Sequence, residues 1–156
     1  MKIKIILALL LIVLVLCSLF YYNHQQTQPF RCDTQIVSHT ERDDGKIDIN
    51  LNTNIIFTLH HESVISFNGS VTQDGREYLV SRRFFFTTTP TELNGVKKTI
   101  ITREQISKYD KLPAGIWQEY IFQGREFYIQ MTAVNNNGFL LQDLSHPLFI
   151  CARSEN

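Results

Sequence analysis

The run "HHE" at His60, His61 and Glu62 is the first place where residue types could do chemistry, because imidazole and carboxylate groups are zinc ligands. Adjacent residues on a strand point to opposite faces, so His60 and His61 do not easily share one ion. Neither HExxH nor CxxC occurs in the sequence. We therefore predict no metal site and interpret the two histidines as surface residues at the end of a strand.

The histidines remain candidates for a response to pH, because an unperturbed imidazole gains its proton just below neutral pH. His39, His60, His61 and His146 all lie downstream of the apolar N-terminal run discussed below. We predict His60, His61 and His146 as pH-responsive residues on the surface of the domain.

No residue pattern indicates a nucleophile. No serine lies in a G-x-S-x-G elbow, and the serine of "NGSVT" follows residues typical of a turn. A nucleophilic Cys32 or Cys151 conflicts with the disulfide that we expect between them. The carboxylates are scattered, and Asp74 and Asp110 have ordinary explanations at a turn and a helix end. We therefore predict a protein that is not an enzyme, with no catalytic residue and no cofactor.

The most unusual cluster is Arg82-Arg83 followed by Phe84, Phe85 and Phe86. On a strand, Phe84 and Phe86 share one face and Phe85 takes the other. One interpretation is a strand buried on both sides, with both arginines extended outward to water. The other is a face that meets a partner or an apolar ligand, since aromatic residues and Arg are enriched at interface cores.

Residues 47–59 form the clearest predicted element. Apolar residues and one threonine occupy alternate positions from Ile47 to Leu59. Asp or Asn occupies each position between them from 48 to 54. This alternation predicts one long strand with an apolar face and a wet face. Ile55 and Phe57 on its apolar face join the arginine and phenylalanine cluster as a candidate surface for a partner or ligand.

The remaining pattern predicts short antiparallel strands and one helix. Asn68-Gly69, Asp74-Gly75 and the run "NNNG" at 135–138 are hairpin signals. Thr102 could cap a helix over "REQISKYDKL", with Pro113 and Gly115 ending it, and "IWQEYIF" would follow as a strand. The count is seven or eight strands. The expected fold is α+β but mostly β, an antiparallel curved sheet or an incomplete barrel with one short helix.

Cysteine positions agree with export. Cys17 lies inside the apolar run, whereas Cys32 and Cys151 bracket the domain. An oxidising compartment favours a bond between Cys32 and Cys151, although two unpaired thiols or pairing with another chain are alternatives.

The N-terminal run has three interpretations: a cleaved signal peptide, a lipoprotein signal ending at Cys17, or a retained anchor. It is uncharged from Ile5 through Leu10, Leu16 and Phe20, and Tyr21 and Tyr22 extend it to eighteen positions, whose length of roughly 27 Å matches one hydrocarbon core. No Ala-x-Ala site follows, and the residue before Cys17 is not small. We favour an anchor, with Lys2 and Lys4 keeping the N-terminus in the cytoplasm. The predicted organisation is a cytoplasmic N-terminus at 1–4, a transmembrane anchor at 5–22, a tether at 23–31 and a periplasmic β-rich domain at 32–156.

The charge of the exported part argues against nucleic-acid binding. Without Lys2 and Lys4, thirteen Lys and Arg face fifteen Asp and Glu, a net charge near −2. Binding to phosphates requires a basic face, and no basic block occurs. We predict no direct contact with nucleic acid.

The layout, together with "ISFNGSV", "GREYLVSRRFFF" and the closing "PLFICAR", resembles the inner-membrane accessory proteins of the FidL, PsaF, MyfF and ToxS kind. The resemblance implies a partner, a ToxR-like winged-helix membrane activator of fimbrial or other virulence genes, which the accessory protein binds and stabilises or activates. It also implies a lipocalin-like barrel with room for an apolar small ligand such as a bile salt. Two alternatives are a stand-alone periplasmic ligand-binding module and an envelope-assembly module.

Overall fold

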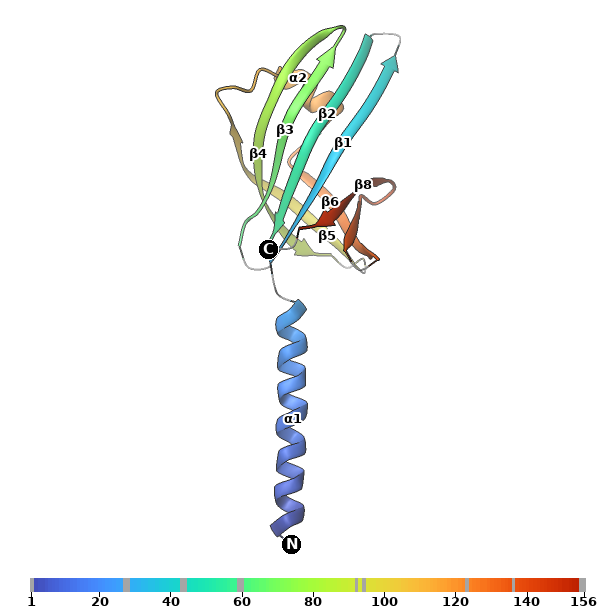
Figure 1. Cartoon of the computed structure of the whole chain (residues 1–156). Helices are drawn as coiled ribbons and strands as arrows, with labels where there is room; N and C mark the ends of the chain where they lie inside the picture. The colour runs from blue at the N-terminus through green and yellow to red at the C-terminus, as the bar shows by residue number, and fades with distance from the viewer. Residues whose placement is uncertain are drawn as a thin grey trace.

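The structure is a computed structural model that describes residues 2–26, 29–42, 45–58, 61–91, 93, 95–122, 124–135 and 137–154. One helix extends away from a β-domain that carries a second, short helix (Figure 1). The elements in chain order are α1 (Lys2–Gln26), β1 (Phe30–Arg42), β2 (Gly45–Phe57), β3 (Ser63–Gln73), β4 (Arg76–Pro90), β5 (Val96–Ile106), α2 (Ala114–Tyr120), β6 (Glu126–Val134), β7 (Gly138–Gln142) and β8 (Pro147–Arg153).

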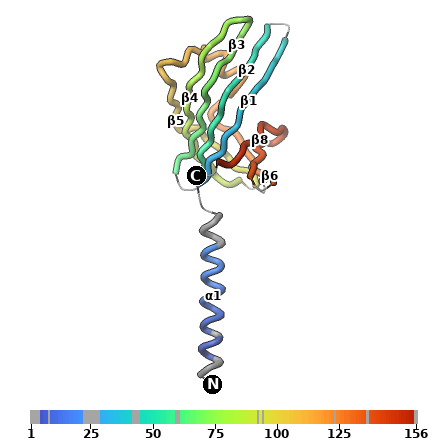
Figure 2. Tube along the Cα trace, viewed as in Figure 1, coloured from blue at the N-terminus to red at the C-terminus, as the bar shows by residue number. Residues whose placement is uncertain are grey.

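The eight strands form a closed antiparallel barrel in which each strand pairs with its neighbours in the sequence and β8 returns to β1. The mostly β prediction is confirmed, but the prediction of an incomplete barrel is wrong. The closure is short: among the described residues, β8 pairs with only Cys32 and Asp33 of β1. The strands β1–β3 extend far beyond β6 and β8 at the end opposite α1 (Figure 2). The pairing of β8 with β1 that closes the barrel therefore lies at the end near α1.

The alternating pattern of β2 places its apolar face inside the barrel, as predicted. Ile47, Ile49, Leu51, Ile55 and Phe57 are all at most 9% exposed and point into the barrel. The polar residues between them are partly or fully exposed. Leu59, which we included in this strand, lies outside the described residues.

Two of the three hairpin predictions are confirmed. Asp74 and Gly75 form the β3–β4 turn with positive φ, and Asn135 has positive φ in the turn between β6 and β7. The Asn68-Gly69 prediction is wrong because both residues lie inside β3, paired with Asn52 and Leu51 of β2. Gly69 is needed for a close approach, since a Cβ at this position would overlap the carbonyl oxygen of Asn50.

The prediction of the helix is wrong in position. The segment from Thr102 to Ile106 belongs to β5, where Arg103–Ile106 pairs with β4, so strand pairing outweighs the local helix signal. Pro113 begins a helix instead of ending one: it is the N-cap of α2, which covers most of the segment we predicted as a strand. The strand β1 was also missed, because its sequence is too polar to alternate clearly.

The helix α1 covers the apolar run. Its side chains include Ile5, Leu10, Leu16 and Phe20, and each is at least 55% exposed. Within the part of the chain that the structure describes, no helix reaches the combination of length and apolarity that crossing a membrane requires. The membrane span therefore stays a prediction.

Candidate functional site

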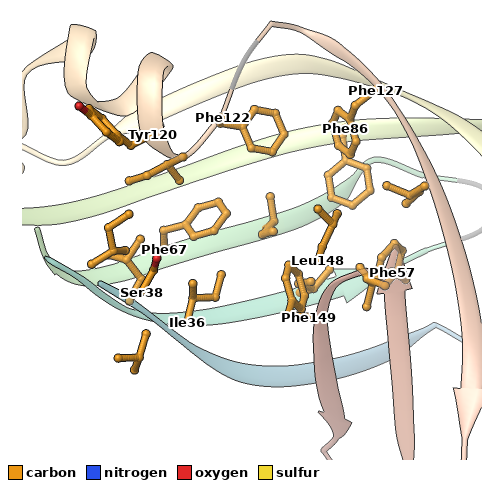
Figure 3. Close-up of a pocket in the computed structure, with 18 residues that line it drawn as sticks. Ile36, Ser38, Phe57, Phe67, Phe86, Tyr120, Phe122, Phe127, Leu148 and Phe149 are labelled. Atoms are coloured by element: carbon orange, nitrogen blue, oxygen red, sulfur yellow. The ribbon is translucent and has the colours of Figure 1, made fainter. Parts of the chain in front are cut away.

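An apolar cavity of about 480 Å³ lies inside the barrel. Its walls come from the inner faces of β1–β4, from α2 and the residues after it, and from β6–β8. The lining side chains form an elongated strip, with Ser38, Ile36 and Tyr120 at one end and Phe57, Phe86 and Phe127 at the other (Figure 3). The cavity is therefore suited to bind an apolar molecule.

The chemistry of the lining supports this conclusion. Among the 18 residues drawn around the cavity, all are aliphatic or aromatic except Ser38, and none carries a charged side chain. Tyr120 supplies the one other hydroxyl group among them. Val37 is 70% exposed and Leu148 is 49% exposed, so they mark the opening toward solvent. This opening lies beside the part of β1 that β8 does not reach.

Several residues of the predicted surface lie in this wall. Ile55 and Phe57 of β2 and Phe86 of β4 line the cavity, and the Phe57 and Phe86 rings meet edge to face at 5.7 Å. Phe84 also points inward but stacks on Trp117 at 5.3 Å. The structure therefore places the predicted apolar residues inside the barrel.

Arg83 and Phe85 lie on the outer side of β4. Arg83 is exposed, and the Phe85 ring lies under the guanidinium group of Arg103 at 3.7 Å. The alternation of the strand thus separates these two residues from Arg82, Phe84 and Phe86.

The outward orientation of both arginines is wrong for Arg82, whose side chain is only 4% exposed. Its Nε and Nη2 donate to the two carboxylate oxygens of Asp110, each at 2.9 Å, and Nη2 also donates to the Leu112 carbonyl at 2.6 Å. The guanidinium lies 4.8 Å from the centre of the Trp117 ring. The sequence predicts only an ordinary helix end at Asp110, and no local signal indicates its pairing with Arg82 across 28 residues.

The Asp110 carboxylate is held ionised by this network. Burial acts to raise the pKa of Asp110, but hydrogen bonds from Arg82 and from the Ser81 and Leu112 amides outweigh it, and the pKa lies below its ordinary value. The pair ties the loop after β5 and the start of α2 to the wall of the barrel. The network lies beside α2, at the end of the barrel opposite α1 (Figure 1).

The predicted disulfide is present at the opposite end. Cys32 and Cys151 are bonded, with Cα atoms 5.5 Å apart, and both are fully buried. The bond lies where β8 meets β1, and the Ser154 amide donates to the Arg31 carbonyl beside it at 3.0 Å. Side-chain hydrogen bonds from Ser154 and Asn54 lower the pKa of Asp33 at the same place. The covalent bond therefore reinforces a very short strand pairing.

The histidines predicted to respond to pH do not lie in the same loop. His60 lies outside the described residues, and the exposed His61 follows it between β2 and β3. The exposed His146 lies between β7 and β8, where its amide and that of Ser145 donate to Asp143 and lower the pKa of that carboxyl. The response to pH stays a prediction.

The sequence of β1 did not predict that this strand contributes side chains to the cavity. Ile36 and Ser38 face the cavity, and Val37 lies at its opening. The segment mixes apolar and polar residues on both faces, so alternation gave no signal. Only its pairing with Leu51 and Ile49 of β2 orients it.

Comparison with known protein families gives a match. The model of the FidL-like putative membrane protein family matches residues 69–151, which is more than half of the chain. No curated protein matches it.

Proposed function

The chain belongs to the FidL-like family of membrane proteins, and from this premise we propose that it is a membrane-anchored periplasmic accessory protein of a membrane transcription activator. The partner is the exported segment of a ToxR-like winged-helix activator, of the kind that controls fimbrial or other virulence genes. The accessory protein binds that segment and stabilises or activates it. Its effect on transcription is indirect, because the exported part has no basic block for phosphates.

The observation that carries the proposal is the unpaired edge of β1. All thirteen residues of β1 pair with β2, whereas the described pairs with β8 end at Asp33. In residues 35–42, the backbone N–H and C=O groups that point away from β2 therefore have no strand partner among the described residues. An edge of this kind favours the addition of a strand from another chain.

This edge replaces the strands that we expected to make the contact. Ile47–Ile56 of β2 and Arg82–Phe86 of β4 pair with a strand on each side, so these residues, which we expected to make the contact, lie on no edge. Ile55, Phe57 and Phe86 line the cavity, and Phe84 packs in the core. A partner strand on β1 would instead lie beside Val37, at the opening of the cavity.

Anchoring supports the pairing. The uncharged run 5–22 and the two lysines before it motivate a single-pass topology in the inner membrane with the N-terminus in the cytoplasm. Tethering two chains to one bilayer raises their effective concentration, so a modest intrinsic affinity is sufficient.

The anchor has its own test. We expect alkaline phosphatase fused to the C-terminus to be active, and we expect the mature protein to retain Ile5–Phe20 at its N-terminus. Fractionation and N-terminal sequencing measure both properties. A soluble periplasmic form that begins after residue 18 would contradict the retained anchor.

The partner has a separate test in cells. A photo-crosslinking amino acid at Val37 should capture the activator, whereas the same amino acid at Leu79, which is exposed on β4, should not. Deleting the gene should lower the abundance of the activator or the transcription of its targets, and expression of the anchored protein should restore them. The proposal fails if activator abundance and target transcription are normal in the deletion strain, in both acidic and neutral media.

A second candidate is a stand-alone periplasmic ligand-binding module. The closed barrel and its apolar cavity of about 480 Å³ favour it. The two candidates differ in what deletion does: a stand-alone module leaves the activator unchanged.

A further inference from the structure

We propose that the cavity holds one unbranched alkyl chain, such as that of a fatty acid or a single-chain phospholipid, with its polar head at the opening between β1 and β8. The inference rests on the ligand-binding candidate above and names the chemistry of its ligand. It replaces the broader expectation of an apolar ligand such as a bile salt.

The shape of the cavity favours a chain over a ring system. The lining follows β2 from Ile49 to Phe57, and eight steps along a strand span roughly 26 Å. One extended alkyl chain can follow the whole of this strip, whereas the rigid fused rings of a steroid nucleus are too short to do so.

The polarity of the lining agrees with the shape. The deep end is formed by rings, with Phe57, Phe86 and Phe127 around it (Figure 3). Because none of the 18 lining residues is charged, nothing among them compensates a buried carboxylate or the several hydroxyl groups of a bile salt. A head group therefore stays in water.

The opening is suited to a head group. Ser38 lies near one end of the strip, and Val37 beside it is 70% exposed. Leu148 faces the opening from β8 and is 49% exposed. A chain can enter sideways here because strand pairing between β1 and β8 stops at Asp33 among the described residues.

The test measures binding of radiolabelled octanoate, decanoate and dodecanoate to the full-length protein by equilibrium dialysis. Digitonin serves as the detergent because it contains no alkyl chain. We expect the affinity to rise roughly four-fold for each added methylene until the cavity is full, the value that burial of one CH₂ group implies. Taurocholate should not displace dodecanoate at equal concentration.

Two variants of β1 distinguish binding of the fatty acid in the cavity from its partition into the detergent micelle. Ser38→Trp places a ring in the path of the chain and should abolish saturable binding. Glu41→Trp places the same ring at an exposed position on the opposite face of the strand and should leave binding unchanged. If Ser38→Trp does not fold, Leu148→Trp at the opening replaces it.

Two further measurements identify the lipid that supplies the alkyl chain. Unlabelled dodecanoate and lysophosphatidylcholine compete in parallel, and lipids that copurify with the protein are identified by mass spectrometry. Competition by lysophosphatidylcholine supports the alkyl chain, and the identity of the copurifying lipid names its source. An affinity independent of chain length, stronger binding of taurocholate, or full binding by both variants at the opening would overturn the proposal. Crosslinking at Val37 in cells reports on the activator, so that proposal can fail or succeed separately.

Discussion

Replacing Arg82 with alanine is expected to lower the free energy of unfolding by about 3–5 kcal/mol, the usual cost of breaking a buried ion pair by removing one partner. Asp110, whose side chain is 2% exposed, would lose two hydrogen bonds, and the Leu112 carbonyl would lose one. The measurement is denaturant unfolding followed by the fluorescence of Trp117, which packs beside Arg82.

Arg83→Ala is the matched control, since it removes the same side chain one position away, on the exposed face. It should change the stability by less than about 0.5 kcal/mol. Equal effects of the two substitutions would show that the buried pair contributes nothing beyond an exposed arginine.

The effect of Arg82→Ala should also depend on pH. In the native protein the pKa of Asp110 is lowered, so its contribution is complete above the ordinary pKa of 3.8 and is lost as the pH falls through the lower folded value. Without Arg82, the hydrogen bond and the opposite charge that lower the pKa of Asp110 are lost, so this pKa is higher in the variant than in the native protein. The difference between the two proteins should therefore shrink as the pH falls from 7 to below 3.8. A constant difference over this range would contradict the assignment.

Removing the disulfide is the second change with a large expected effect. Cys32→Ser should lower the free energy of unfolding by about 2–5 kcal/mol, since the bond closes a loop of 119 residues in sequence and the chain-entropy argument gives about 4.7 kcal/mol for a loop near 100. The loss should be visible as a lower unfolding midpoint, equal to that of the native chain under reduction.

The control for Cys32→Ser is Cys17→Ser on α1, where the thiol is free and exposed. It should leave the midpoint unchanged. Non-reducing mass spectrometry should find the peptides of Cys32 and Cys151 linked. Alkylation of both thiols in native membranes, without prior reduction, would refute the bond.

The sequence by itself determined those features that depend on neighbouring residues. The inward face of β2 follows from strict alternation, and the Asp74-Gly75 turn follows from a backbone conformation that these residues tolerate. The pairing of Cys32 with Cys151 could be predicted because they are the only two cysteines outside the N-terminal run, which left few alternatives. The resemblance to FidL-like proteins was likewise found from the sequence and is confirmed.

Only the tertiary structure decided the features that depend on which strands meet. Residues after Thr102 carry a local helix signal, yet β4 supplies hydrogen-bonding partners that extend them into a strand. Arg82 carries a charge that favours water, yet Asp110, 28 positions later, compensates it in the interior. The edge of β1 is unpaired because β8 meets this strand of thirteen residues only at Cys32 and Asp33 among the described residues. Strand register and loop closure join residues far apart in sequence, and local patterns do not encode these distances.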